Sequence, residues 1–382
     1  MYAVSDTWAT AQESFLAPEG LIEISCYIPE LKETLVYTKK DLLSFTHHQT
    51  GSLVSSELPK NHIEFSLDNT DDKWNPHNPK GLAKYLVERL KITLRYGFVI
   101  DGVAQWIPGG VFYLSEWKTP QNGIEASFAA RDILEYLIDR PYTGKIEGTL
   151  YDVVQNVLEE ANIPKSEAIL GKIVLGKTAM GIVNISDELK KYNAASIDYK
   201  GDETMAVVIQ KCANAARCVM YQGRDGCFTI GRLPTKRTDY TIAQRFSYAH
   251  PEIEITRPIK SVAVNYAGDA TKTWQFADSG EVQTVSNDFI KTGEQSRTVA
   301  RWVRDSLLSR EWITGDFRGD PRFDVFDTVN IESKYGTVTC VVLTDIKVTF
   351  TGAFRVTYVG YVYGDSTAGI AYSGEIFTGE VL

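Results

Sequence analysis

Residues 317–360, FRGDPRFDVFDTVNIESKYGTVTCVVLTDIKVTFTGAFRVTYVG, decide the fold class of this chain. They hold runs rich in Val, Thr, Ile, Tyr and Phe in which apolar and polar residues alternate, a pattern that predicts β-strands. Tyr335-Gly336 and Thr351-Gly352 separate the runs and are typical turn pairs. The stretch therefore predicts three consecutive strands, at 326–333, 337–350 and 354–364.

The segment just before these strands indicates a structural joint. An amphipathic pattern predicts a helix over 297–313. After this helix, Gly315 fits a C-cap, and Gly319 offers the positive φ that a tight turn requires. Asp320 before Pro321 favours an extended backbone and a side chain that initiates a turn. We therefore predict that Gly315, Gly319, Asp320 and Pro321 join the helix to the strands.

Residues 318–320 spell Arg-Gly-Asp, a triplet known as an adhesion signal. An adhesion triplet must be displayed on a mobile loop, whereas this one lies between a predicted helix and a predicted strand. Short motifs of this kind often occur by chance. We therefore interpret the triplet as part of the joint and not as a cell-binding signal.

The first third of the chain shows the same alternation. Residues 1–20 have little periodicity and are interpreted as an N-terminal arm. Residues 21–142 then predict a β domain, a sandwich or small barrel, because several short strands are separated by turn pairs such as Asn75-Pro76 and Asn122-Gly123. The domain ends in a short predicted helix, 131–139. Its strands are predicted near 21–29, 62–69, 90–98, 111–117 and 123–130.

The middle of the chain, 143–254, has helical periodicity instead. Two apolar faces predict helices over 149–164, with Thr149 as N-cap and Pro164 as a stop, and over 202–218. Two short strands are expected around Asp225-Gly226. The chain is therefore predicted to be mainly β (α+β overall), with an α+β insertion between a first β domain and a second one at 255–364. Residues 365–382 form a C-terminal tail.

Composition limits the possible functions. The net charge of −9 argues against a surface that grips nucleic acid, since phosphate binding needs clustered Lys and Arg. Five cysteines without a CxxC motif indicate neither a disulfide framework nor a zinc site, and favour a reducing compartment. No apolar run reaches the ~20 residues of a membrane span, and the first residues do not form a secretory signal. We therefore expect no membrane anchor.

Residues with catalytic chemistry are not gathered into a motif. No HExxH, GxSxG, P-loop or GxGxxG occurs, so we predict no catalytic residue, no cofactor and no metal ligand, and thus no enzyme. His47-His48 is interpreted as part of a solvated loop. The run DNTDDKWNPHNP at 68–79 lacks the central Gly and terminal Glu of a calcium loop, and is interpreted as a turn capped by its own Asn and Asp side chains.

Four tryptophans lie near predicted turns or element ends, where packing or subunit contact is the expected role. Tryptophan is a typical anchor of protein interfaces. Glycan binding is the alternative role for such residues. The candidate interface residues are Trp74, Trp106, Trp117 and Trp312.

The order of these motifs resembles the tail and baseplate hub proteins of tailed bacteriophages and phage-derived tail particles. IEFSLDNTDDKWNPHNP at 63–79, followed by LKITLRYGFVIDGVAQWIPGGVFYLSEWKTP at 90–120, is similar to the N-terminal half of that family. The stretch 317–360 is similar to its last barrel, in which Gly-Asp-Pro and Asp-x-Val precede strands that end in Phe-Gly-Phe-x-x-Thr. The resemblance covers roughly residues 20–363.

The resemblance implies a homotrimer at the virion tail tip, assembled in the host bacterial cytoplasm. Each subunit would supply two tube-like β-barrels, 21–142 and 255–364, so that three subunits form a pseudo-sixfold ring around the DNA exit channel. The ring would join a distal tail ring or tail tube protein to a threefold spike or tail fibre protein. DNA would pass an acidic lumen without specific binding, and strands 337–350 and 353–363, with 92–117, are the expected channel and ring contacts.

Three alternatives remain at this point. A hexameric distal tail ring protein usually has one tube-like barrel near its start, whereas two barrels around an insertion favour the hub. A receptor- or glycan-binding module is suggested by the abundant aromatic residues, which include 20 Tyr and 16 Phe. A cell-wall hydrolase would need two carboxyl groups that converge in a cleft, and no pair of them is singled out.

Overall fold

The computed structural model describes residues 1–14, 16–119, 124–163, 183–233, 240–268 and 270–362. Strands dominate these residues, and the mainly β fold class is confirmed. The predicted turn at Asn122-Gly123, the predicted stop at Pro164 and the tail at 365–382 lie outside the described residues. No helix in the described ranges is long and apolar enough to cross a membrane. The α-helices of these ranges are α1 (Asp6–Glu13), α2 (Leu150–Glu160), α3 (Met205–Ala215) and α4 (Gly293–Ser306).

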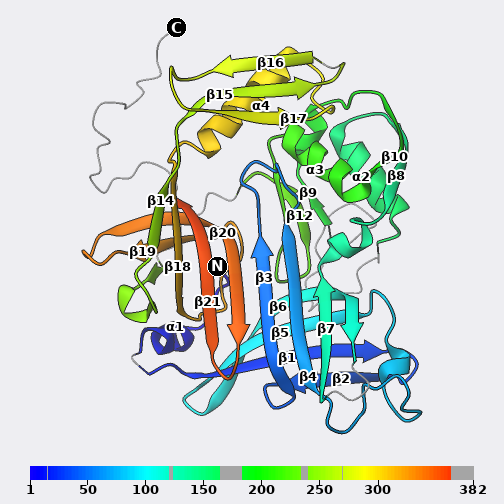
Figure 1. The fold of residues 1–382 in the computed structure, drawn as a ribbon, viewed down its shortest axis with the longest axis vertical. Helices are drawn as coiled ribbons and strands as arrows, with labels where there is room; N and C mark the ends of the chain where they lie inside the picture. Colours follow the sequence, from blue (N-terminus) through cyan, green and yellow to red (C-terminus); the bar gives the residue numbers. More distant parts are fainter. Residues whose placement is uncertain (15, 120–123, 164–182, 234–239, 269, 363–382) are drawn as a thin grey trace.

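Most strands belong to one large sheet, which is antiparallel along its main path (Figure 1). The strand order is β14-β18-β21-β20-β3-β4-β7-β6-β5-β1-β2, and β19 with β13 branches from β20. The early part of the chain supplies β1 (Glu19–Ile28), β2 (Glu33–Thr38), β3 (Leu42–Thr50), β4 (Lys60–Asp68), β5 (Lys91–Ile100), β6 (Val103–Lys118) and β7 (Glu125–Arg131). The late part supplies β13 (Thr241–Ile242), β14 (Glu252–Ile255), β18 (Glu311–Arg318), β19 (Thr328–Glu332), β20 (Val338–Phe350) and β21 (Phe354–Val362).

Strands β3 and β20 join the two parts of the chain. They pair antiparallel from Asp345 opposite Thr50 to Phe350 opposite Phe45. Strands from both predicted barrel domains are therefore hydrogen-bonded to each other within one sheet. Figure 1 shows β21, β20, β3 and β4 side by side through the centre of the molecule.

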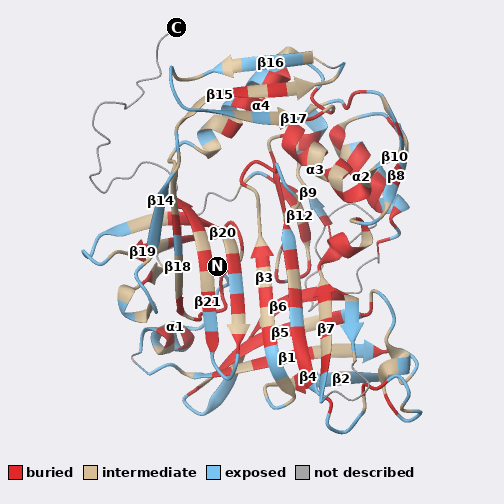
Figure 2. Cartoon of the chain, in the orientation of Figure 1, coloured by how far each residue is buried: buried red, intermediate tan, exposed pale blue. Residues whose placement is uncertain are grey.

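The first part of the sheet curls over to enclose a core. In Figure 1, β1 and β5 run across the ends of β3, β4 and β7, and Figure 2 shows buried residues where they cross. Strand β4 illustrates the cause, because Ile63, Phe65 and Leu67 are buried on one face whereas Glu64 is exposed on the other. The rings of Phe45 and Tyr96 meet in this core with centroids 6.1 Å apart.

The predicted α+β insertion is present as two helices and short strands. Helix α2 begins at the predicted N-cap, where Thr149 accepts a hydrogen bond from the Asp152 N–H and Asp152 accepts one from the Thr149 N–H. The hairpin of β11 and β12 turns at Asp225-Gly226, with Gly226 at φ +78°. The remaining elements are β8 (Pro141–Ile146), β9 (Val183–Ile185), β10 (Ile197–Thr204), β11 (Val219–Gln222), β12 (Phe228–Gly231) and the 3-10 helix η3 (Asp187–Lys191).

The insertion holds the sheets β10-β8 and β11-β12-β9, and a further three-stranded sheet lies at the end of the molecule that Figure 1 shows at the top. Its order is β16 (Ala270–Gln275), β15 (Ile259–Tyr266) and β17 (Glu281–Ser286), with α4 packed on one face. Val299 and Val303 of α4 are buried there. The late part of the chain therefore contributes both this small sheet and half of the large one.

Several predicted elements differ from the structure. The helix predicted over 297–313 ends at Ser306, because residues from Glu311 onward form strand β18, which pairs with β14 and, from Trp312, with β21. The predicted helix at 131–139 is a single 3-10 turn, η2 (Ile133–Tyr136). The arm contains α1, which Trp8 anchors by burying its ring against Phe98.

Strands β2 and β3 were not predicted, and the solvated-loop interpretation of His47-His48 is wrong. Both histidines lie in β3, and His47 is buried. The loop that follows, 51–56, is also largely buried. It packs against the insertion, where Ser55 donates to the Cys218 carbonyl at 2.8 Å and Asn214 donates to the Val54 carbonyl at 2.8 Å.

Candidate structural joint

The predicted joint residues lie where β18 leaves the large sheet. Gly315 lies inside β18 opposite Tyr358, so the helix C-cap predicted for it is wrong. A Cβ at Gly315 would lie 2.5 Å from the Tyr358 hydroxyl. Gly315 therefore makes room for a buried ring, and this is a packing requirement on the strand and not a helix ending.

Gly319 is required for close approach and not for a positive φ. It is not among the glycines with positive φ, so the predicted reason is wrong. Its N–H donates to the Phe354 carbonyl at 2.7 Å, and a Cβ at this position would lie 2.6 Å from the Phe354 Cβ. The Phe354 ring in turn packs against Tyr96 and Phe98 of β5, with centroids 5.5 and 5.4 Å apart. The glycine therefore lets the turn lie against Phe354, whose ring packs in the core of the first part of the sheet.

Asp320 is buried and ion-paired within its own turn. Its carboxylate accepts from Arg322 Nε at 2.9 and 2.8 Å, and the ion pair brings Arg322 Nη2 within 2.6 Å of Asp320 Oδ2. It also accepts from the Arg322 N–H at 3.2 Å, which closes the turn around Pro321. The Arg322 guanidinium lies over the Tyr240 ring, 5.1 Å from its centroid. The pair thus fixes the turn to the segment before β13.

The Arg-Gly-Asp triplet is not displayed for a receptor. Asp320 is 1% exposed, and Arg318 lies over the Phe246 ring, 3.9 Å from its centroid. Arg318 also donates to the carbonyls of Gln12 and Ser14 next to the end of α1. These contacts hold all three residues of the triplet against the protein.

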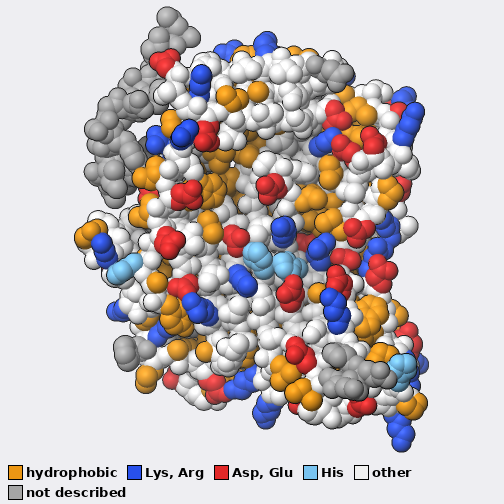
Figure 3. All heavy atoms as spheres, in the orientation of Figure 1, with side chains coloured by type: hydrophobic (Ala, Val, Ile, Leu, Met, Phe, Trp, Pro, Cys, Tyr) orange, Lys and Arg blue, Asp and Glu red, His pale blue; other side chains and the backbone are white. Residues whose placement is uncertain are grey.

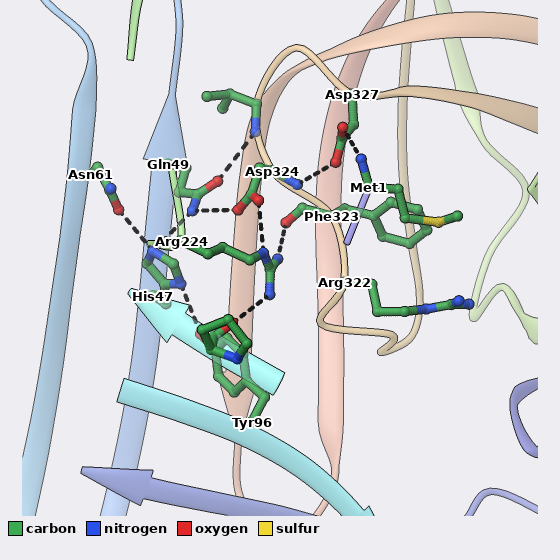
Figure 4. Close-up of polar contacts among 12 residues, drawn as sticks. Met1, His47, Gln49, Asn61, Tyr96, Arg224, Arg322, Phe323, Asp324 and Asp327 are labelled. Atoms are coloured by element: carbon green, nitrogen blue, oxygen red, sulfur yellow. Dashed lines mark hydrogen bonds and ion pairs between the residues drawn. The ribbon is translucent and has the colours of Figure 1, made fainter. Parts of the chain in front are cut away.

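A buried polar network lies beside the joint and connects three parts of the chain (Figure 4). Its centre is Arg224, in the hairpin of the insertion. Arg224 Nε donates to Asp324 Oδ2 at 2.7 Å, and the guanidinium also donates to the carbonyls of Phe323 and Pro108. Asp324 Oδ1 accepts from Gln49 Nε2 of β3 at 3.1 Å. The insertion, β3 and the loop before β19 are thus held together by one ion pair and its neighbours.

His47 continues this network into the core of the first part of the sheet. Its Nδ1 lies 2.7 Å from the Tyr96 hydroxyl, and its Nε2 lies 2.8 Å from Asn61 Oδ1. Gln49 Nε2 also lies 3.2 Å from His47 Nε2, so both ring nitrogens have polar partners. Burial lowers the pKa of His47 to about 4, and the hydrogen bond between His47 and Asn61 opposes this shift. The imidazole is therefore neutral and structural at neutral pH.

Other buried acids also lie at contacts between the parts. Asp132 accepts from the Leu134 N–H at 3.0 Å and caps η2, and burial raises its pKa to about 7. Asp327 pairs with the N-terminal ammonium of Met1, as Figure 4 shows, and accepts from the Asp324 N–H at 2.9 Å. Burial and the neighbouring Asp324 raise the pKa of Asp327. Sequence reasoning did not find this network, because its members are far apart in the chain.

The four tryptophans differ in accessibility. Trp74 is 3% exposed and packs between Tyr37 and Phe128, with centroids 6.0 and 5.1 Å away, so its side chain serves packing. The predicted Asn and Asp caps of its loop are present, since Asn69 Oδ1 accepts from the Trp74 N–H at 2.7 Å. Trp106 is half-buried beneath Arg95, and Trp312 is half-buried against Tyr361. Trp117 is 37% exposed.

The described residues contain no group of three or more His, Cys, Asp or Glu side chains arranged to hold a metal ion. No protein-family model matches the sequence, and comparison with curated proteins likewise gives no match. Similarity is found among solved structures. The fold is shared along nearly the whole chain with several tail proteins.

The chain is similar to the tail protein from Neisseria meningitidis, with 12% identity, a TM-score of 0.58, and coverage of 90% of this chain and 96% of that one. It is similar to the 43 kDa tail protein of prophage MuSo2 from Shewanella oneidensis, with 11% identity, a TM-score of 0.57, and coverage of 90% and 98%. It is also similar to the prophage tail protein gp18 from Listeria monocytogenes, with 13% identity, a TM-score of 0.52, and coverage of 90% and 95%.

The chain therefore has the fold of phage tail proteins, and the resemblance is confirmed at the level of the fold. Identities of this size show a shared fold alone.

Proposed function

We propose that this chain is a structural protein of a phage or phage-derived tail, and that three copies form a hub ring at the tail tip or baseplate. The pairing of β20 with β3 is the observation that carries this proposal, because it places two sets of antiparallel strands from one chain in a single sheet. Three such chains would present six sets of strands. That number suits a sixfold tail tube on one side and a threefold spike or fibre on the other.

The joint supports a rigid ring element. Hydrogen bonds among Arg224, Asp324 and Gln49 connect the insertion to both parts of the large sheet. The Phe354 ring of the late part packs against Tyr96 of the early part. Buried ion pairs and hydrogen bonds of this kind fix a unique arrangement of the parts. A ring that couples a tube to a spike needs subunits that hold their shape under load.

In this proposal the chain binds copies of itself, a distal tail ring or tail tube protein, and a central spike or tail fibre protein. DNA passes through the central channel. The chain acts in the virion tail tip after assembly in the host bacterial cytoplasm. Its role is structural and not enzymatic, and cell-wall lysis, tested by a zymogram with the purified chain, is expected to be absent.

Electron microscopy of the purified chain tests the proposal. Closed rings with a central hole and threefold or pseudo-sixfold averages would support a hub. Rings with six equal subunits would support the distal tail ring protein instead. Single compact particles at every concentration, together with binding to host glycans, would contradict both and favour a receptor-binding module.

A further inference from the structure

The outward face of the large sheet carries a row of basic side chains across neighbouring strands. Paired residues place Lys347 of β20 opposite His48 of β3, His48 opposite His62 of β4, and His62 opposite Arg131 of β7. Directly paired residues lie on the same face of an antiparallel sheet. Figure 3 shows histidine side chains at the centre of this face, over β3 and β4, with both basic and acidic side chains close by.

The two histidines are close together and open to solvent. Their ring centroids are 5.4 Å apart, and their side chains are 27% and 26% exposed. Burial and the neighbouring His48 lower the pKa of His62. An anion that lies against His62 would oppose this shift, because a nearby negative charge favours the protonated imidazole.

The charges around the pair leave the row positive once the imidazoles are protonated. The titratable groups that face it are Asp345 and Lys347 from β20, Lys60 and Glu64 from β4, and Arg131 from β7. Asp345 lies 3.0 Å from His48 Nε2, and Glu64 lies 3.9 Å from His62 Nε2. Two carboxylates thus face three permanent cations and two imidazoles. Glu135 and Asp132 lie within electrostatic reach of Arg131 and reduce the positive charge at that end of the row. On β18 and β21, Asp316 is paired with Arg355 and adds no net charge.

We propose that this row, from Lys347 through His48 and His62 to Arg131, contacts the phosphate backbone of nucleic acid, and that protonation of the two histidines tightens the contact as pH falls. The inference deepens the proposed function, from which it takes nucleic acid as the partner. The row is a local cluster of basic side chains on a chain whose net charge is −9. Adjacent strands lie about 4.8 Å apart, so the row offers cations at close and regular intervals to a chain of phosphates.

Phosphate binding and protonation of the imidazoles are linked. Bound phosphate stabilises the protonated imidazoles, so binding takes up protons and affinity rises on acidification. Each added phosphate contact steepens the dependence of log affinity on log salt concentration by about 0.9 for duplex DNA. Two protonated histidines are therefore expected to steepen this slope by roughly 2.

The test is fluorescence anisotropy of a labelled double-stranded oligonucleotide of mixed sequence, at low salt, at about pH 7.5 and about pH 5.5, a range that spans the titration of ordinary histidines. We expect the affinity of the natural chain to rise at least about tenfold at the lower pH. His48→Gln with His62→Gln should remove most of that rise. Lys347→Gln should weaken binding at both pH values.

His77→Gln with His250→Gln is the matched control, because both residues are exposed and belong to other elements. The fifth histidine, His47, has a pKa of about 4 and stays neutral throughout the range. Melting temperatures establish that each variant is folded. No binding by the natural chain at the lower pH, or a pH response that survives in the His48/His62 variant, would overturn the inference. If the chain forms rings by electron microscopy but fails this binding test, only the nucleic-acid inference is contradicted. If the chain binds nucleic acid but forms no rings, only the hub proposal is contradicted.

Discussion

The Gly319 N–H donates to the Phe354 carbonyl at 2.7 Å, and no room for a Cβ exists between the two residues. Through this contact the turn before β19 lies against the ring that enters the first part of the sheet. The Gly-Asp-Pro turn and the two phenylalanines around Thr351-Gly352 are separate motifs in the sequence. In the structure they pack together as one unit.

Gly319→Ala should destabilise the fold. The new Cβ would lie 2.6 Å from the Phe354 Cβ and 2.8 Å from its carbonyl carbon, and neither atom is the end of a flexible side chain. Forcing them apart should cost about 1–3 kcal/mol of unfolding free energy. Urea unfolding measures this loss. Gly231→Ala is the control, since its Cβ would make only ordinary contacts at 3.8 and 3.9 Å, and an equal loss in both variants would contradict the account.

The sequence predicted the elements whose signal is local. Strand β4 was visible as an alternation, and α2 as an apolar face with Thr149 as its cap, because strand faces and caps depend on residues a few positions apart. Gly319 was recognised as a necessary glycine, but for the wrong reason. A positive φ is a property of one residue, whereas close approach to Phe354 depends on a strand far along the chain.

The polar network and β3 could not be found in this way. His47 and Gln49 look like solvated residues until Tyr96, Asn61 and Asp324 lie beside them. A buried polar group is tolerated only when distant partners satisfy it. Those partners come from different parts of the chain, and no spacing within the sequence reveals them.

Arg224→Met should destabilise the fold more than an exposed change does. The substitution leaves the Asp324 carboxylate without its cation and removes the donor to the Phe323 and Pro108 carbonyls. The Arg224 side chain is only 4% exposed, so the expected loss is about 3 kcal/mol of unfolding free energy. Chemical denaturation measures it. Arg232→Met removes a pair with Glu188 at 62% side-chain exposure and should change little.

The stability of the chain should depend on His47 below neutral pH. The folded pKa of about 4 lies below the ordinary value of 6.5, so the unfolded chain binds more protons between these values. The contribution of His47 to stability is therefore complete above about pH 6.5 and falls as pH drops towards 4, by up to about 3 kcal/mol. His47→Gln should flatten this part of the plot of unfolding free energy against pH. The difference between the variant and the natural chain is the quantity to compare, because Asp132 contributes equally to both proteins. Parallel profiles for the two proteins would show that folding does not shift the pKa of His47, and would contradict the account.

Trp74→Ala and Trp117→Ala should separate packing from assembly. Trp74 lies in the core against Tyr37 and Phe128, and its loss should cost about 3–5 kcal/mol. Trp117 is 37% exposed, so its replacement should leave the melting temperature nearly unchanged and weaken association between copies. Thermal melts and ring counts by electron microscopy measure the two effects. Unchanged ring counts for Trp117→Ala would remove it from the interface.

The mass of the purified chain in solution tests the hub proposal most directly. Native mass spectrometry, or light scattering coupled to size-exclusion chromatography, should give three times the chain mass of 42.7 kDa across a range of concentrations. A complex of six chains would contradict the trimeric hub and indicate the distal tail ring instead. A single chain at every concentration would contradict both ring models.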